Sequence, residues 1–287
     1  MFDNSIFSRS GTEIDNRKTN SDRYNVRYKM LIEPINWVGK TVLNIGSHNG
    51  LWPAAQLHAG AKKVTGIECR EELVNLSIQK VSNNNFTVIH DDMFSALTEL
   101  KGQRFDIIFL CGTLLHTLYH LDLIRDISNL EFDLFVLDCP FWPSEEPMVY
   151  ILAEGSTWSG NALTNIKQQI SYTNPQQIQN RFHDTLAGIP SLKYTDILLE
   201  GFGLTYTQID YSLIESSLTN DEKSRTIDYL IKQTRILHIK KSQNFNNILT
   251  PVGEQLTKTD KEFGWDVDRV RTIIANELNN NYEYFVE

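Results

Sequence analysis

Cysteine is scarce in this sequence of 287 residues, which contains only Cys69, Cys111 and Cys139. The three are widely spaced and lie in or beside apolar runs, so neither a disulfide framework nor a zinc knuckle is expected from them. This usage is typical of proteins kept in a reducing compartment. The sequence therefore predicts a cytoplasmic protein.

Long apolar runs and an excess of positive charge are also missing. No run approaches the roughly 18 apolar residues of a membrane span, and residues 1–24 lack the basic start and apolar core of a signal peptide. The formal net charge of -9 gives no overall attraction to phosphate backbones or anionic lipids. We therefore expect neither a membrane protein nor a general nucleic-acid binder.

Short β-rich runs alternate with segments of helical period. Predicted strands are 41–45, 63–68, 86–90, 105–110, 132–138, 203–210 and 234–241. Predicted helices are 51–60, 71–82, 94–101, 118–129 and 191–200. Near-continuous apolar strands that alternate with helices are typical of a parallel sheet covered on both faces. The pattern predicts an α/β domain around a mostly parallel, seven-stranded sheet.

The segment 141–189 interrupts this pattern, because it is rich in Gln, Asn, Ser and Thr and has little apolar periodicity. It carries Trp142 and Trp158. Long segments of this kind in a compact domain are often functional, so we predict a cap over a site; a plain surface insertion is the alternative. The predicted organisation is an N-terminal helical segment (1–40), a cofactor-binding half (41–140), the cap, the C-terminal half of the sheet (190–243) and a helical extension (244–287).

Gly46 and Gly50 follow the first predicted strand in the stretch TVLNIGSHNGLW. Glycine permits positive φ and close approach of the backbone to a ligand. Glu68 ends the second strand, where a carboxylate can accept hydrogen bonds from two ribose hydroxyls, and Asp92 follows the third. Because the carboxyl ends of parallel strands meet at one edge, these residues predict a nucleotide-like cofactor site. A nicotinamide-binding turn is the alternative, although its G-x-G-x-x-G is absent.

The stretch 41–140 resembles the cofactor-binding half of class I S-adenosylmethionine-dependent methyltransferases, whose usual opening reads Val-Leu-Asp-Ile-Gly-Cys-Gly-Thr-Gly. The resemblance includes VLNIGSHNG, VTGIE, FTVIHDDMF and RFDIIFLCGTLLH. The run GTLLH (112–116) and the passage 189–204 are similar to the subgroup of tRNA wobble-uridine carboxymethyl transferases. The resemblance implies a Rossmann-like fold, S-adenosylmethionine as cofactor and transfer of a methyl or modified methyl group.

Carried over to this chain, the family's motifs assign cofactor contacts to loop and strand-end residues. They are Asn44, Gly46, Ser47, His48 and Gly50 around the methionine part, Glu68 at the ribose, Asp92 and Met93 at the adenine, and Gly112 after the fourth strand. Two positions depart from the motif. Asn44 stands in place of an acid, whose function an amide oxygen can supply in part, and His48 replaces the middle glycine.

His116 follows the fourth predicted strand, where donor and acceptor should meet. An imidazole there can remove a proton from an attacking nucleophile, and a structural role in a partly buried shell is the alternative. His116 and His120 have the i, i+4 spacing of a metal pair on a helix, but no acid or cysteine is clearly placed to complete a site. We therefore predict no metal.

The cluster DRYNVRY (22–28) precedes the first strand. In related enzymes an N-terminal helix often covers the cofactor, so Arg23 or Arg27 could bind its carboxylate, with Arg27 assigned. Tyr24 and Tyr28, with Trp158 from the cap, are assigned to the acceptor. The alternative is an amphipathic helix with paired tyrosines and solvated arginines.

The sequence thus predicts methyl transfer to a small-molecule acceptor by in-line displacement. The donor is already activated, so the protein chiefly aligns the nucleophile and excludes water. Transfer to a tRNA base and binding of S-adenosylmethionine without chemistry are the two alternatives.

Overall fold

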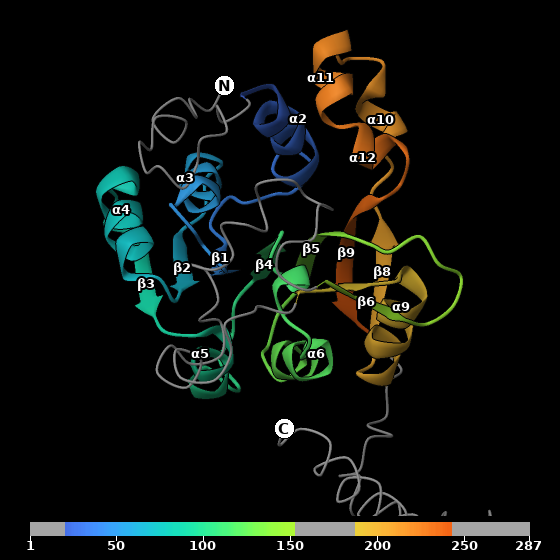
Figure 1. The fold of residues 1–287 in the computed structure, drawn as a ribbon. Helices are drawn as coiled ribbons and strands as arrows, with labels where there is room; N and C mark the ends of the chain where they lie inside the picture. Colours follow the sequence, from blue (N-terminus) through green and yellow to red (C-terminus); the bar gives the residue numbers. More distant parts are fainter. Residues whose placement is uncertain (1–20, 153–186, 243–287) are drawn as a thin grey trace, which may run out of the picture. The chain divides into compact units, whose positions relative to one another are not determined.

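The computed structural model describes residues 21–152 and 187–242 and has a seven-stranded sheet in the order β3-β2-β1-β4-β5-β9-β8 (Figure 1). The strands are β1 (Thr41–Ile45), β2 (Lys63–Glu68), β3 (Phe86–His90), β4 (Ile107–Cys111), β5 (Leu134–Pro140), β8 (Leu204–Gln208) and β9 (Thr234–Lys241). The first five are parallel, and β9 is antiparallel to both β5 and β8. The prediction of a mostly parallel, seven-stranded α/β sheet is confirmed.

Helices cover both faces of the sheet, one group above it and one below it in Figure 1. The lower group comprises α5 (Met93–Glu99), α6 (His120–Ser128) and α9 (Leu192–Gly201). The upper group contains α2 (Ser21–Leu31) and α3 (Leu51–His58), while α4 (Glu71–Val81) packs beside β2 and β3. Each face has its own apolar core, because successive side chains of a strand point to opposite faces. In β1, Leu43 and Ile45 belong to one core and Val42 to the other.

The predicted helix 118–129 is found as α6, and a separate 3-10 helix precedes it. A 3-10 helix, η2, ends at His116 (Leu114–His116), and α6 begins at His120. Between them Thr117 is extended, with φ -138° and ψ 156°, and its hydroxyl accepts a hydrogen bond from the N–H of Tyr119 at 3.0 Å. Such a local side-chain bond competes with helical pairing. The break places the two histidines on different elements.

Three short helices between β8 and β9 were not predicted. They are α10 (Ser212–Glu215), α11 (Asn220–Arg225) and α12 (Ile227–Leu230). A capping box between Thr219 and Glu222 starts α11. These helices join α2 above the sheet, where α11 contacts α2 and α12 contacts β9.

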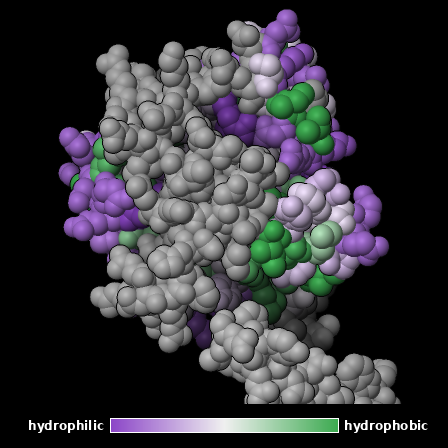
Figure 2. Space-filling view, viewed as in Figure 1, coloured by the Kyte–Doolittle hydropathy of each residue, from purple (hydrophilic) through white to green (hydrophobic). Residues whose placement is uncertain are grey.

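The two ends of the predicted cap meet in a separate two-stranded sheet. Strand β6 (Val149–Leu152) pairs antiparallel with β7 (Ala187–Pro190). Trp142 stacks on Tyr150 of β6 with ring centroids 3.8 Å apart. Ile151 of β6 is exposed, and Figure 2 shows hydrophobic surface in this region. Trp158, the rest of the cap and the extension 244–287 lie outside the described residues. Within the described part, no helix is long and apolar enough to cross a membrane.

Candidate functional site

The loop from Gly46 to Gly50 turns tightly at the carboxyl end of β1. Gly46, His48 and Gly50 have φ angles of 73°, 50° and 85°, all in the left-handed region that favours glycine. The N–H groups of Gly46 and Ser47 both donate to the carbonyl of Ile67 at 2.9 Å. The loop is therefore fastened to β2, with its backbone at the edge where a ligand of this fold binds.

Glycine at position 46 is required by space as well as by φ. A Cβ there would lie 2.4 Å from Oγ1 of Thr113. Ser47 is 1% exposed, and its side chain lies against Gly66, where a Cβ would be 2.6 Å from Oγ of Ser47. Only the backbone of Ser47 is therefore placed to meet a ligand on the loop.

Glu68 lies at the end of β2 and holds the loop from the side. Its Oε2 accepts a hydrogen bond from the N–H of His48 at 3.0 Å, which fixes the one non-glycine residue of the loop with positive φ. Arg70 donates to the same carboxylate through Nε at 2.8 Å and Nη2 at 3.3 Å. Burial alone raises the pKa of Glu68, but Arg70 outweighs it and leaves the pKa below its ordinary value. Glu68 is a carboxylate in the neutral range.

Asp92 and Met93 lie at the next strand end, where α5 begins. Asp92 is the N-cap: its Oδ1 accepts from the N–H groups of Phe94 at 2.9 Å and Ser95 at 3.1 Å. Its Oδ2 accepts from the Ser95 hydroxyl at 2.6 Å. Met93 is 4% exposed and belongs to the lower apolar core, so its side chain serves packing.

His116 ends η2, beyond the carboxyl end of β4, and lies near the loop residues. Burial, with the positive charges of Arg70 and His48, lowers the pKa of His116 to about 4 despite the opposing charge of Glu68. The imidazole is therefore neutral at pH 7 and able to accept a proton. His120 does not join it: this ring is 1% exposed and packs edge-on against Tyr194 at 6.0 Å.

Metal binding finds no support in the described ranges. Across residues 21–152 and 187–242, no three side chains of His, Cys, Asp or Glu are gathered as a metal ion would require.

Asn44 is turned into the protein rather than displayed at the strand end. It is 1% exposed, and its Nδ2 donates to Oε1 of Gln56 on α3 at 3.2 Å. Gln56 is itself fully buried. The amide at position 44 thus pairs with a second amide between β1 and α3.

Arg27 is directed to a carboxylate of the protein itself. Its Nη2 donates to Oδ2 of Asp138, at the end of β5, and to Sγ of Cys111 at 2.7 Å. The Tyr229 hydroxyl completes this polar cluster with bonds of 2.9 and 3.1 Å to Asp138, and the Arg27 guanidinium lies 5.2 Å from the Trp52 ring. Sequence reasoning missed Asp138, although an acid inside the apolar run FVLDC was a visible signal.

The other assigned residues of α2 have different surroundings. Tyr24 packs edge-on against Trp52 at 6.4 Å, and Tyr28 packs against the upper apolar core. Arg23 forms a two-bond ion pair with Asp228 of α12 at 2.7 and 2.9 Å. In the described residues α2 is thus bound to the sheet and to α12 by its arginines.

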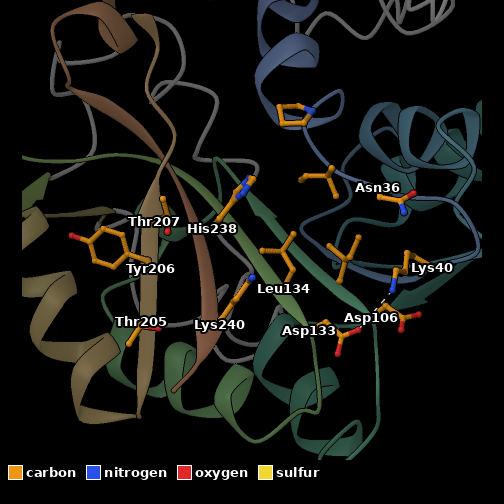
Figure 3. Close-up of a pocket in the computed structure, with 13 residues that line it drawn as sticks. Asn36, Lys40, Asp106, Asp133, Leu134, Thr205, Tyr206, Thr207, His238 and Lys240 are labelled. Atoms are coloured by element: carbon orange, nitrogen blue, oxygen red, sulfur yellow. Dashed lines mark ion pairs between the residues drawn. The ribbon is translucent and has the colours of Figure 1, made fainter. Parts of the chain in front are cut away.

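A cavity of about 480 Å³ lies at the opposite end of the sheet (Figure 3). Its lining includes Asp106 and Asp133, directly before β4 and β5, and His238 of β9. Lys40 forms an ion pair with Asp133 at 3.8 Å. The amino ends of the parallel strands meet here, so this cavity is separate from the loop of Gly46 and Gly50.

No family model and no curated protein matches the sequence. Solved structures with the same fold include an S-adenosylmethionine-dependent methyltransferase from Mesorhizobium loti, at 10% identity and TM-score 0.52 over 77% of this chain and 99% of that one. Geranyl diphosphate C-methyltransferase from Streptomyces coelicolor A3(2), in complex with Mg2+, geranyl diphosphate and S-adenosyl-L-homocysteine, has 12% identity and TM-score 0.52 over 83% and 88%. This chain has the Rossmann-like fold of these class I methyltransferases.

Proposed function

We propose that the chain is an S-adenosylmethionine-dependent methyltransferase that acts on a small molecule. The observation that carries the proposal is the loop of Gly46, His48 and Gly50, with its left-handed residues fastened to β2 beside the carboxylate of Glu68. A backbone loop and an ionised acid at one sheet edge suit a ligand with an amino-acid part and a ribose.

The described residues fit this cofactor. The loop would hold the methionine part through its backbone, and Glu68 would accept from the ribose hydroxyls in place of its present Arg70 donors. Asp92 keeps acceptor capacity on Oδ2 for the adenine amino group, because a carboxylate oxygen can accept two hydrogen bonds. Gly112, with φ 67°, has nothing within 4 Å of the point that a Cβ would occupy, so its backbone can be approached closely.

The cofactor supplies an activated methyl group, and the chain supplies alignment and proton removal. His116 is the proposed base, because it is neutral above a pH of about 4 and lies at the edge where the acceptor should meet the donor. His116 would take the proton that the acceptor loses on methyl transfer.

A small-molecule acceptor is proposed on charge. The net charge of -9 opposes binding of a polyanion such as tRNA. Geranyl diphosphate is the acceptor bound in one structure of the same fold, which supports this substrate class for the present chain.

Binding without catalysis is the second candidate, and Asn44 favours it. The buried pair with Gln56 leaves no carboxylate at the end of β1 for the cofactor's amino group. Such a protein would bind S-adenosylmethionine and transfer nothing.

The test combines calorimetry and transfer of label. S-adenosylhomocysteine should bind the parent protein, and Glu68→Gln should weaken that binding by roughly 1.5 to 3 kcal/mol, the range for a hydrogen bond to a charged group. Lys63→Gln, at the other end of β2, is the control. Incubation with labelled S-adenosylmethionine should then label a metabolite extract rather than bulk tRNA.

The outcomes separate the candidates. Binding without any labelled product supports the non-catalytic protein, and labelled tRNA identifies the acceptor class as wrong. Binding of a nicotinamide cofactor, with none of S-adenosylmethionine or its product, contradicts the proposed function.

A further inference from the structure

The Glu68 carboxylate has its acceptor positions filled by the protein. A carboxylate offers about four such positions on two oxygens. Oε1 accepts from the N–H of Arg70 at 3.1 Å and from its Nε at 2.8 Å. Oε2 accepts from the N–H of His48 at 3.0 Å and from Nη2 of Arg70 at 3.3 Å. The Sγ of Cys69 also lies 3.8 Å from Oε1 as a weak donor. Two of these bonds come from one guanidinium.

Burial makes this pair an obstacle to a ligand. Glu68 is 2% exposed and Arg70 is 8% exposed. A ribose cannot reach the carboxylate while the guanidinium lies on it. Binding of a ribose to Glu68 requires the Arg70 side chain to leave.

The backbone of Arg70 permits this movement. Its carbonyl accepts from the N–H groups of Leu73 and Val74, both at 3.0 Å, at the start of α4. Its own N–H donates to Glu68, as described above. These bonds hold the main chain of Arg70, so its side chain can rotate away without loss of helix or strand. Glu71 and Glu72, exposed in the first turn of α4, can receive the positive charge.

We propose that Arg70 sets the cofactor affinity by holding the two positions on Glu68 that the ribose hydroxyls take when the cofactor binds. The proposal rests on the proposed function and deepens it, since it makes binding an exchange of partners at one carboxylate. Only a ligand with a free 2′,3′-diol replaces both bonds of the guanidinium. A deoxyribose replaces one or none, and a 2′-phosphate is repelled by Glu68. Arg70 is thereby a specificity-determining residue for the diol.

A role of Arg70 in orienting Glu68 would give the opposite change in cofactor affinity. If Arg70 stayed on Glu68 to orient it toward the ribose, removal of the guanidinium would weaken cofactor binding. Under the exchange, removal of Arg70 leaves a buried carboxylate short of two donors, and the ribose then restores them without competition. The variant should be less stable alone and should bind more tightly.

The experiment measures S-adenosylhomocysteine binding by calorimetry in the parent, Arg70→Ala and Arg70→Gln. We expect Arg70→Ala to lower Kd about tenfold, which corresponds to 1.4 kcal/mol, and to lower Tm in the absence of ligand. With the 2′,3′-dideoxy analogue, parent and variant should have the same Kd. Arg70→Gln keeps the side chain as far as Cδ but lacks the guanidinium, and it carries the same test should the alanine variant not fold.

Three outcomes decide the proposal. Tighter binding of S-adenosylhomocysteine, absent with the dideoxy analogue, supports the exchange. Unchanged or weaker binding in the variants, while the parent binds, overturns it and leaves the proposed function in place. No binding by the parent or by either variant contradicts the proposed function and the exchange together.

Discussion

Replacement of Gly46 by alanine tests whether the loop is fixed by space or by φ alone. The added Cβ would lie 2.4 Å from Oγ1 and 3.1 Å from Cγ2 of Thr113. Rotation about χ1 of Thr113 could move Oγ1 away from the new Cβ, but it would also take the hydroxyl away from the carbonyl oxygens of Ile45 and Cys111, which lie 3.5 and 3.3 Å from it. Thr113 is also 6% exposed, and it has no open space to enter.

The magnitude has two parts. An alanine in the left-handed region costs about 1 to 2 kcal/mol, and overpacking in a filled region costs about 1 to 3 kcal/mol more. Gly46→Ala should therefore destabilise the protein by about 2 to 5 kcal/mol. Gly102→Ala is the matched control, because Gly102 has φ 76° and nothing within 4 Å of the point that its Cβ would occupy. Gly102→Ala should therefore be destabilised only by the cost of an alanine in the left-handed region, about 1 to 2 kcal/mol.

Urea denaturation of the two variants measures the free energy of unfolding, with the denaturant slope checked for constancy. A third variant, Gly46→Ala with Thr113→Ala, removes both close atoms. The double variant should lose less stability than the sum of the two single changes, because the clash is then relieved. Equal losses in Gly46→Ala and Gly102→Ala, with additive behaviour of the double variant, would refute the spatial argument.

Three further predictions concern charges and caps. Folding lowers the pKa of His116 from its usual 6.5 to about 4, so the unfolded state binds the proton at a higher pH than the folded state does. The free energy of unfolding should therefore drop by roughly 3 kcal/mol as the pH falls from 6.5 to 4. Urea titrations at several pH values should show a weaker pH dependence of stability in His116→Gln. Asp138→Asn leaves Arg27 buried without its carboxylate and should lower the free energy of unfolding, measured by thermal denaturation, by about 3 kcal/mol or more. The control Asp133→Asn removes a carboxylate from an exposed ion pair and should leave Tm unchanged. Asp92→Ala should cost about 1 kcal/mol and Asp92→Asn much less, since asparagine also caps; equal losses in calorimetric unfolding would exclude the cap role.

The sheet could be predicted because its signals are local. Each parallel strand is a short apolar run, and both faces need apolar side chains, so the run itself marks the strand. Glu68 could be predicted as a strand-end acid for the same reason. The short helices α10, α11 and α12 have four to six residues and too few turns to impose a clear apolar period on the sequence.

The partners of the site residues could not be predicted, because they come from distant parts of the chain. Arg27 meets Asp138 across 111 positions, and Tyr229 reaches the same carboxylate across 91. No periodicity records such pairs. Arg70 was close enough to notice, two residues after Glu68, but a basic side chain next to a strand end is ordinarily solvated. Only the structure shows that Arg70 is buried and hydrogen-bonded to the Glu68 carboxylate.

The pairing of β6 with β7 brings Leu152 directly opposite Ala187. The entropic cost of bringing two strands of one chain together grows only slowly with the number of residues between them, by about 0.6 kcal/mol for each doubling. The pairing of β6 with β7 should therefore depend only weakly on the number of residues between the two strands. An evolving lineage could therefore vary the chain length between β6 and β7 while it keeps the loop of Gly46 and the carboxylate of Glu68. The same junction offers a protein engineer a place to graft foreign sequence.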